Sequence, residues 1–130
     1  MSLHRREGSR VIDNLKLYVN NDSALVRRGR WVSLQFLLGV GEKDFLIDID
    51  RGFIKSVGPR VLATDAGCFT IRATQETWAE HWSVIPKRDY HDIWSMLPKG
   101  LAIIDGDLLP LMQNLQYFKD VIASPRGKEA

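Results

Sequence analysis

The segment from Asp44 to Asp50 restricts the fold of this chain more than any other part of the sequence. It reads DFLIDID, so that Phe45, Ile47 and Ile49 alternate with other, mainly acidic, side chains. A period of two predicts a β-strand with one face in a core and the other in water. Outward carboxylates are typical of an antiparallel sheet, so we interpret these aspartates as solvent-facing rather than as a metal or acid–base site.

Other segments of the chain predict strands that complete a sheet around this one. Residues 31–38 and 53–57 alternate in the same way before and after it, which predicts an antiparallel meander. Gly52 lies in the short turn between two of these strands and is expected to adopt a positive φ. Residues 68–73 form a fourth alternating strand, and residues 101–104 a short, wholly apolar fifth strand.

Apolar residues recur at helical spacing in the remaining segments. Ser9 is a suitable N-cap for a first helix, and Thr74 for a second helix that reaches Ile85. A third helix is expected over residues 87–97, and the last helix follows the capping residue Asp107. The predicted apolar face of this last helix consists of Leu108, Leu111, Met112, Leu115, Phe118 and Ile122.

This order of elements predicts an α+β fold. Four strands follow the first helix, and two short helices, a strand and a helix come after them. We therefore expect a five-stranded, mainly antiparallel sheet with helices covering one face. The expected organisation is a single domain over residues 9–123, preceded by a disordered leader of residues 1–8 and followed by a polar tail of residues 124–130.

Charge and reactive side chains argue against several classes of function. Eighteen Lys and Arg against 16 Asp and Glu give a net charge of +2, too even a balance for a nucleic-acid binder. Cys68 is the only cysteine, which excludes an internal disulfide, and we interpret it as a buried structural thiol. His4, His81 and His91 lack zinc-binding spacing, and we expect His81 and His91 to be exposed or capping residues. We expect no enzyme, metal or cofactor.

Large aromatic side chains are more numerous than a minimal core requires. The two short predicted helices carry Trp78, Trp82, Tyr90 and Trp94, over strands that already supply Phe36, Phe45, Phe53 and Phe69. Any one of these rings is most simply a core residue. Together they exceed what two tightly packed layers need, which indicates either a cavity or a surface for a partner protein.

Several motifs resemble the sterol carrier protein 2 family in sequence and in order, over about residues 25–122. The strand GCFTIRAT is followed by the helix QETWAEHW and then by LPKGLAIIDGDLLPLMQNLQYF. Features of the family fall on Phe69, Ile71, Ala73, Trp78, Gly100, Leu101, Ile103, Gly106, Asp107 and residues 108–115. The resemblance implies a sheet covered by helices that encloses an apolar tunnel for sterols, fatty acids, acyl chains or other lipids, with no catalytic centre.

The resemblance and the aromatic residues together predict a lipid carrier or presenter. Its expected ligand-binding residues are Phe36, Phe45, Phe69, Ile71, Trp78, Trp82, Trp94, Ile103, Leu111 and Leu115. An accessory module for an enzyme that handles a hydrophobic intermediate, such as a quinone precursor, remains an alternative. An acid–base enzyme using His81 or His91 with Asp92 is disfavoured, because both histidines fall on predicted helices.

The expected surroundings of the protein follow from the absence of long apolar runs. No apolar stretch approaches the length of a membrane span, so we expect at most peripheral membrane contact. The sequence ends in GKEA, without the peroxisomal targeting tripeptide of some family members, and we expect a cytoplasmic protein. The expected partners are a lipid or another apolar small molecule and, in the alternative, a protein.

Overall fold

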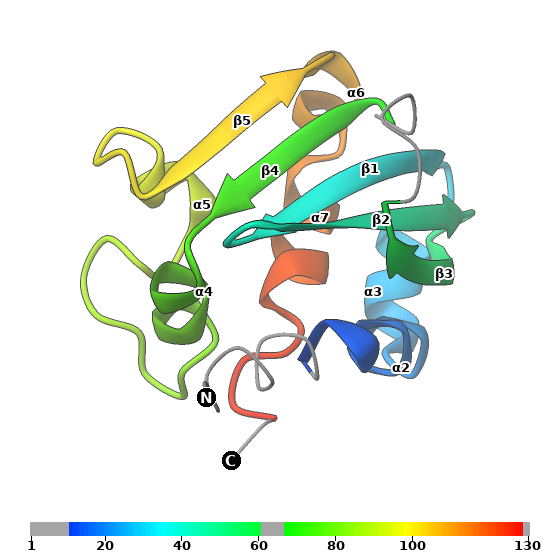
Figure 1. Cartoon of the computed structure of the whole chain (residues 1–130). Coiled ribbons are helices and arrows are strands. Elements are labelled where there is room, and N and C mark those ends of the chain that lie inside the picture. Colours follow the sequence, from blue (N-terminus) through cyan, green and yellow to red (C-terminus); the bar gives the residue numbers. More distant parts are fainter. Residues whose placement is uncertain (1–10, 61–66, 129–130) are drawn as a thin grey trace.

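A five-stranded sheet forms the upper layer of the protein in Figure 1, and helices cover its lower face. The computed structural model describes residues 11–60 and 67–128. The order across the sheet is β3-β2-β1-β4-β5. All neighbouring strands are antiparallel except β1 and β4, which confirms the predicted α+β class. The strands are β1 (Ser33–Val40), β2 (Lys43–Asp50), β3 (Phe53–Pro59), β4 (Phe69–Ala73) and β5 (Ala102–Gly106).

The first three strands form the predicted meander, with the alternation that the sequence indicates. Phe36 lies opposite Ile47 in the β1–β2 pair, and both side chains are fully buried. On the outer face, the carboxylate of Asp44 accepts hydrogen bonds from Nη2 of Arg72 at 2.8 and 2.9 Å. Arg60 Nη1 lies 3.3 Å from the same carboxylate. Asp44 therefore faces outward as predicted and belongs to an ion-pair cluster.

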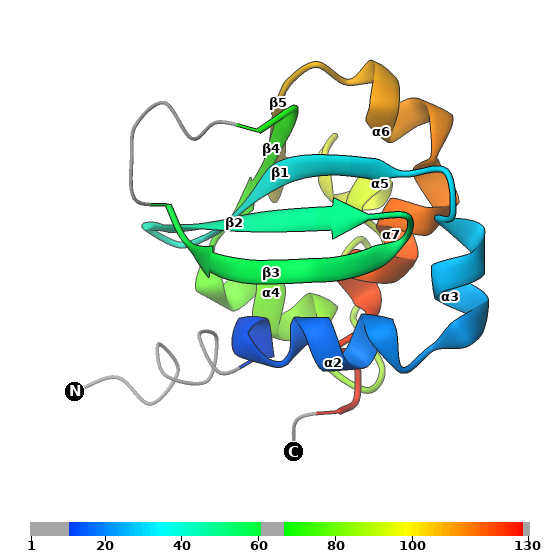
Figure 2. The same ribbon diagram turned by 90° about the vertical axis from the view of Figure 1, so that its right-hand side faces the viewer.

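Two short N-terminal helices support the edge of the sheet. In Figure 2, α2 (Leu15–Asn20) runs beneath β3, and α3 (Ser23–Arg28) stands at the end of the sheet. The side-chain amide of Asn20 donates to the carbonyl of Ile54 and accepts from its N–H, at 2.9 and 2.8 Å. These hydrogen bonds fix α2 against strand β3. The predicted cap Ser9 and the predicted leader of residues 1–8 lie outside the described residues.

The helices after β4 are shorter than predicted. Thr74 caps α4 (Gln75–His81) as expected, but the helix ends at His81, and Ile85 is 85% exposed. The predicted helix over residues 87–97 is reduced to α5 (Ile93–Met96), capped by Asp92. Asp89 adopts a positive φ of 74°, which differs from the negative φ of an α-helix, so the predicted helix cannot pass through this residue.

The predicted last helix is two helices, α6 (Leu109–Gln113) and α7 (Leu115–Ala123). Asn114 adopts φ −127° and ψ 37° between them, which interrupts the helical phase. Tyr117 and Val121 are therefore buried, whereas Met112, predicted to be buried, is 55% exposed. The carboxylate of Asp107 accepts the N–H of Leu109, but the N-cap position of α6 is occupied by residue 108, without a side-chain cap bond. Asp107 therefore precedes the cap instead of forming it as predicted. Residue 108, also on the predicted apolar face, is 40% exposed.

Gly52 has the predicted positive φ, 86°, and follows Arg51 at 49°. Successive positive φ values are the pattern of a tight hairpin turn. A Cβ on Gly52 would lie 2.3 Å from the carbonyl oxygen of Val26. The turn therefore needs glycine for its backbone conformation and for its close contact with α3.

We expect Gly52→Ala to lower the free energy of unfolding by about 3 kcal/mol, from backbone strain and the overlap with Val26. Chemical denaturation measures this loss. The matched control is Gly58→Ala in β3, where an added Cβ meets no atom within 4 Å. Equal stabilities of the two variants would contradict the prediction.

Candidate functional site

Three phenylalanines form the centre of the layer between the sheet and α7. The rings of Phe36 and Phe69 stack with centroids 5.1 Å apart. Phe118 meets both edge-on, at 5.6 and 5.2 Å. All three side chains are at most 1% exposed. The structure thus brings two of the predicted ligand-binding residues into contact, and Ile71 and Leu111 are fully buried in the same core.

Trp78 and Trp82 extend this aromatic layer beneath β1 and beside α7. Their rings stack with centroids 5.3 Å apart. Nε1 of Trp78 donates to the carbonyl of Gly39, and Nε1 of Trp82 to that of Ile122, each at 2.8 Å. Buried indoles with a paired N–H are held firmly. These two predicted residues therefore form a fixed wall of the layer.

The remaining predicted residues lie at the margin of the layer or outside it. Phe45 is buried and Trp94 is half-buried against the core. Leu115 is also half-buried. Ile103 is 57% exposed on the edge strand β5, so the structure does not bring it together with the others. Cys68 is partly buried against the same core.

His81 is buried, and the expectation of an exposed or capping histidine is wrong for this residue. It is 2% exposed, and its Nδ1 lies 2.7 Å from the carbonyl oxygen of Tyr90. Its position three residues after Trp78 on the same helix was the signal in the sequence, because that spacing places both on one face. His91 is exposed, as expected.

Arg126 fixes the segment that joins α4 to α5. Its Nε donates to the carbonyl of His81 at 2.9 Å and its Nη2 to that of His91 at 2.8 Å. The N–H of Gly127 donates to the carbonyl of Trp82 at 3.0 Å. Residues near the C-terminus thus hold the histidine in the buried layer.

A comparison with solved structures identifies the fold. A crystal structure of sterol carrier protein 2 matches with a TM-score of 0.70 at 15% identity, over 91% of this chain and 95% of that chain. The chain has the sterol carrier protein 2 fold. This confirms the fold that the sequence motifs indicated. No protein-family model matches the sequence, and no curated protein gives a significant match.

Two further structures share the sterol carrier protein 2 fold. One is a conserved hypothetical protein of Thermus thermophilus, described as possibly a sterol carrier protein. Its TM-score is 0.63 at 15% identity, with 93% of this chain and 90% of that chain covered. The other is UbiJ-SCP2, a ubiquinone synthesis protein, with a TM-score of 0.60 at 16% identity and coverage of 100% and 99%.

The part of the chain that the structure describes contains neither a cluster of metal-binding side chains nor a helix able to span a membrane. Within residues 11–60 and 67–128, no group of three or more His, Cys, Asp or Glu side chains could hold a metal ion. Among the helices of the same residues, none combines the length and the apolar character needed to cross a bilayer.

Burial lowers the pKa of His81 from its ordinary 6.5 to about 4. The unfolded chain therefore binds the proton more readily than the folded chain between these two values. Stability should be complete above about pH 6.5 and fall as the pH drops toward 4, by up to about 3 kcal/mol. Denaturant unfolding across this range measures the effect.

We expect His81→Gln to flatten this dependence, because the side chain that takes up the proton on unfolding is gone. His91→Gln, which removes an exposed imidazole from the same segment, is the matched control. An unchanged slope in His81→Gln would show that other groups cause the acid sensitivity.

Proposed function

We propose that the chain binds an apolar ligand, such as a sterol, fatty acid or other lipid, between its sheet and helices and carries or presents it without catalysis. The observation that supports this most strongly is the fold shared with sterol carrier protein 2 over nearly the whole of both chains. The internal aromatic layer, built from Phe36, Phe69, Trp78 and Trp82, offers the apolar surface that such a ligand needs.

The energetics of burial are sufficient for this role. Each buried methylene contributes about 0.8 kcal/mol, so a chain of about twelve carbons yields on the order of 10 kcal/mol. Ordering of the chain and loss of rigid-body freedom offset a large part of this gain. We therefore expect affinities near the micromolar range without a charged anchor.

The helices differ in how firmly they are held, which suggests where a ligand enters. Trp78 and Trp82 are tied to backbone carbonyls of β1 and α7. In contrast, α6 is a short helix that buries Leu111 while Leu109 is 61% and Met112 55% exposed. We infer that α6 moves to admit the ligand, and that Leu111 and Leu115 contact it there.

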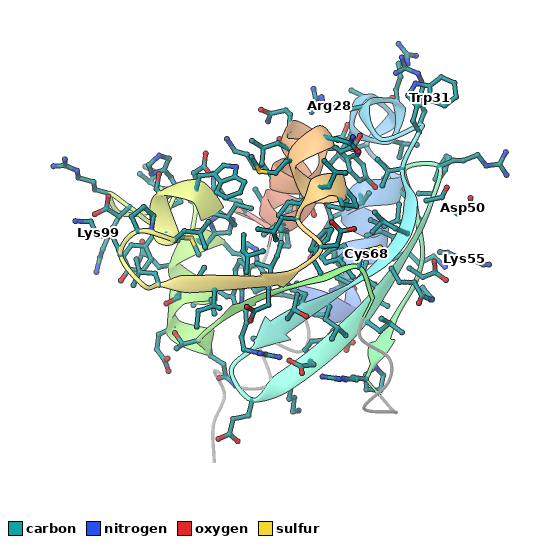
Figure 3. The ribbon with its side chains drawn as sticks, turned by 90° about the horizontal axis from the view of Figure 1, so that it is seen from above. Arg28, Trp31, Asp50, Lys55, Cys68 and Lys99 are labelled. Carbon is teal, nitrogen blue, oxygen red and sulfur yellow. The ribbon has the colours of Figure 1, made fainter. Side chains whose placement is uncertain are left out.

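We expect protein purified under mild conditions to carry lipid, detected by native mass spectrometry and solvent extraction. Titration of delipidated protein with dodecanol should change tryptophan emission, because Trp78 and Trp82 line the proposed site. The change should persist in Trp31→Phe, which removes a ring that is 84% exposed and projects from the periphery of the molecule (Figure 3). Absence of both bound lipid and an emission change would refute the proposal.

A second candidate, an accessory module for an enzyme that handles a hydrophobic intermediate, is favoured by the match to UbiJ-SCP2, a ubiquinone synthesis protein. We expect Leu109→Asp to abolish a complex with such an enzyme, because a charge replaces an exposed apolar side chain. Lys55→Asp, on the exposed side of β3, is the control. Co-purification measures the complex, and retention of the enzyme by Leu109→Asp would argue against this role for α6.

A further inference from the structure

The buried side chains include two polar atoms that nothing satisfies. Within residues 11–60 and 67–128, the buried side-chain nitrogen and oxygen atoms without a hydrogen-bond partner are His81 Nε2 and Trp94 Nε1. By contrast, Trp78, Trp82 and Tyr117 each donate to a backbone carbonyl. Native proteins rarely leave such atoms unpaired, because their lost hydration is costly. The exceptions therefore point to a group that the site is built to receive.

The two atoms have opposite hydrogen-bonding character. His81 Nδ1 lies 2.7 Å from the carbonyl oxygen of Tyr90, and since a carbonyl only accepts, Nδ1 carries the proton. Nε2 is then a bare acceptor in the neutral ring. Arg126 Nη2 lies 3.3 Å from Nδ1 but donates to the carbonyl of His91 at 2.8 Å. Trp94 Nε1 is a donor only.

Both side chains belong to the region where α4 meets the beginning of α5. The carbonyl of Tyr90, which accepts from His81 Nδ1, lies four residues before Trp94 in the sequence. The imidazole of His81 lies edge-on to Trp78, with ring centroids 5.6 Å apart. Trp94 packs against the same core from α5. Hydrogen bonds from His81 to Tyr90, and from Arg126 to both His81 and His91, hold α4 and the end of the segment leading to α5 together.

We propose that His81 Nε2 and Trp94 Nε1 recognise the polar end of the bound lipid, and that this end is a neutral hydroxyl group of an alcohol or a phenol. A hydroxyl donates one hydrogen bond and accepts others, so it can donate to His81 and accept from Trp94. The hydrocarbon part of the ligand then lies against the rings of Trp78 and Trp82. This inference rests on the proposed function.

Charged ends fit this pair of atoms poorly. A carboxylate would meet the lone pair of His81 Nε2, and an ammonium would meet the N–H of Trp94, in a site where desolvation of a charge is costly. Burial lowers the pKa of His81 to about 4, so the ring stays neutral near pH 7.

The neighbouring charges are already engaged with protein groups. Arg126 donates through Nε and Nη2 to backbone carbonyls. Lys119 Nζ lies 2.6 Å from Asp92 Oδ2, and the other carboxylate oxygen accepts the backbone N–H of Trp94. Burial opposes ionisation of Asp92, yet the bonds from Lys119 and Trp94 leave its pKa lowered. Arg126, Lys119 and Asp92 therefore interact with protein groups and do not offer a charge to an ionised lipid head.

Three ligands with the same alkyl chain distinguish the contribution of the hydrogen bond to His81 from that of the hydrogen bond from Trp94. Dodecanol donates and accepts, dodecyl methyl ether only accepts, and dodecane does neither. Their affinities for the full chain are measured by displacement of the uncharged probe diphenylhexatriene. We expect each step, from dodecane to the ether and from the ether to the alcohol, to strengthen binding on the order of tenfold. Dodecanoate should bind more weakly than dodecanol at pH 7.

Two variants assign the steps to their residues. His81→Phe should remove the preference for the alcohol over the ether, and Trp94→Phe the preference for the ether over dodecane. Trp31→Phe is the matched control and should keep both preferences. Trp31 is exposed and lies on the opposite side of the molecule from Lys99 (Figure 3). Should His81→Phe not fold, nitrogen NMR of the wild type should show the His81 Nε2 resonance move with dodecanol but not with dodecane.

The outcomes distinguish this inference from the proposed function. Equal binding of all three ligands, or preferences that survive in both variants, would overturn the role of His81 and Trp94 while leaving lipid binding intact. A water molecule hydrogen-bonded to both His81 Nε2 and Trp94 Nε1 in the lipid-loaded protein would also overturn their proposed role. Failure of every ligand to displace the probe would overturn the proposed function itself.

Discussion

The structure depends on burying large aromatic rings whose polar tips must still be paired. Trp78 reaches a carbonyl of β1, Trp82 a carbonyl of α7, and Tyr117 the carbonyl of Gly52 in the β2–β3 turn. Burial raises the pKa of Tyr117, which keeps its hydroxyl protonated and able to donate. Each ring thereby adds apolar area and also fixes one backbone segment against another. These contacts set the spacing between the sheet and the helices.

That spacing divides the candidate site into a fixed and a less restrained part. Phe36, Phe69 and the two stacked tryptophans are enclosed by strands and by α7, whereas α6 has an exposed apolar side and ends at the break at Asn114. Trp94 differs from Trp78 and Trp82 because its indole N–H has no hydrogen-bond partner among the described residues. The proposed binding site therefore lies at the boundary between a core whose polar atoms are hydrogen-bonded and the two buried atoms that have no partner.

Much of the fold was predictable because local patterns and the final packing agree. The alternation at residues 44–50, the glycine of the hairpin turn and the cap at Thr74 each act over a few residues. The lengths of the helices after β4 were not predictable. Apolar residues keep their helical spacing in the sequence beyond the points at which the backbone leaves the helical conformation. Burial of His81 was missed although its spacing from Trp78 indicated it, and its contacts with Tyr90 and Arg126 form only in the folded chain.

The sequence alone determined the class of fold, the strands, most of the core and the resemblance to sterol carrier protein 2. These depend on periodicity, turn residues and short motifs, all of which can be recognised in the order of residues along the chain. Only the tertiary structure decided that the indole N–H groups of Trp78 and Trp82 are hydrogen-bonded while that of Trp94 is not. It also decided that Ile103 lies on an exposed edge strand. The physical reason is that a hydrogen bond between a side chain and a distant carbonyl exists only once the layers have packed.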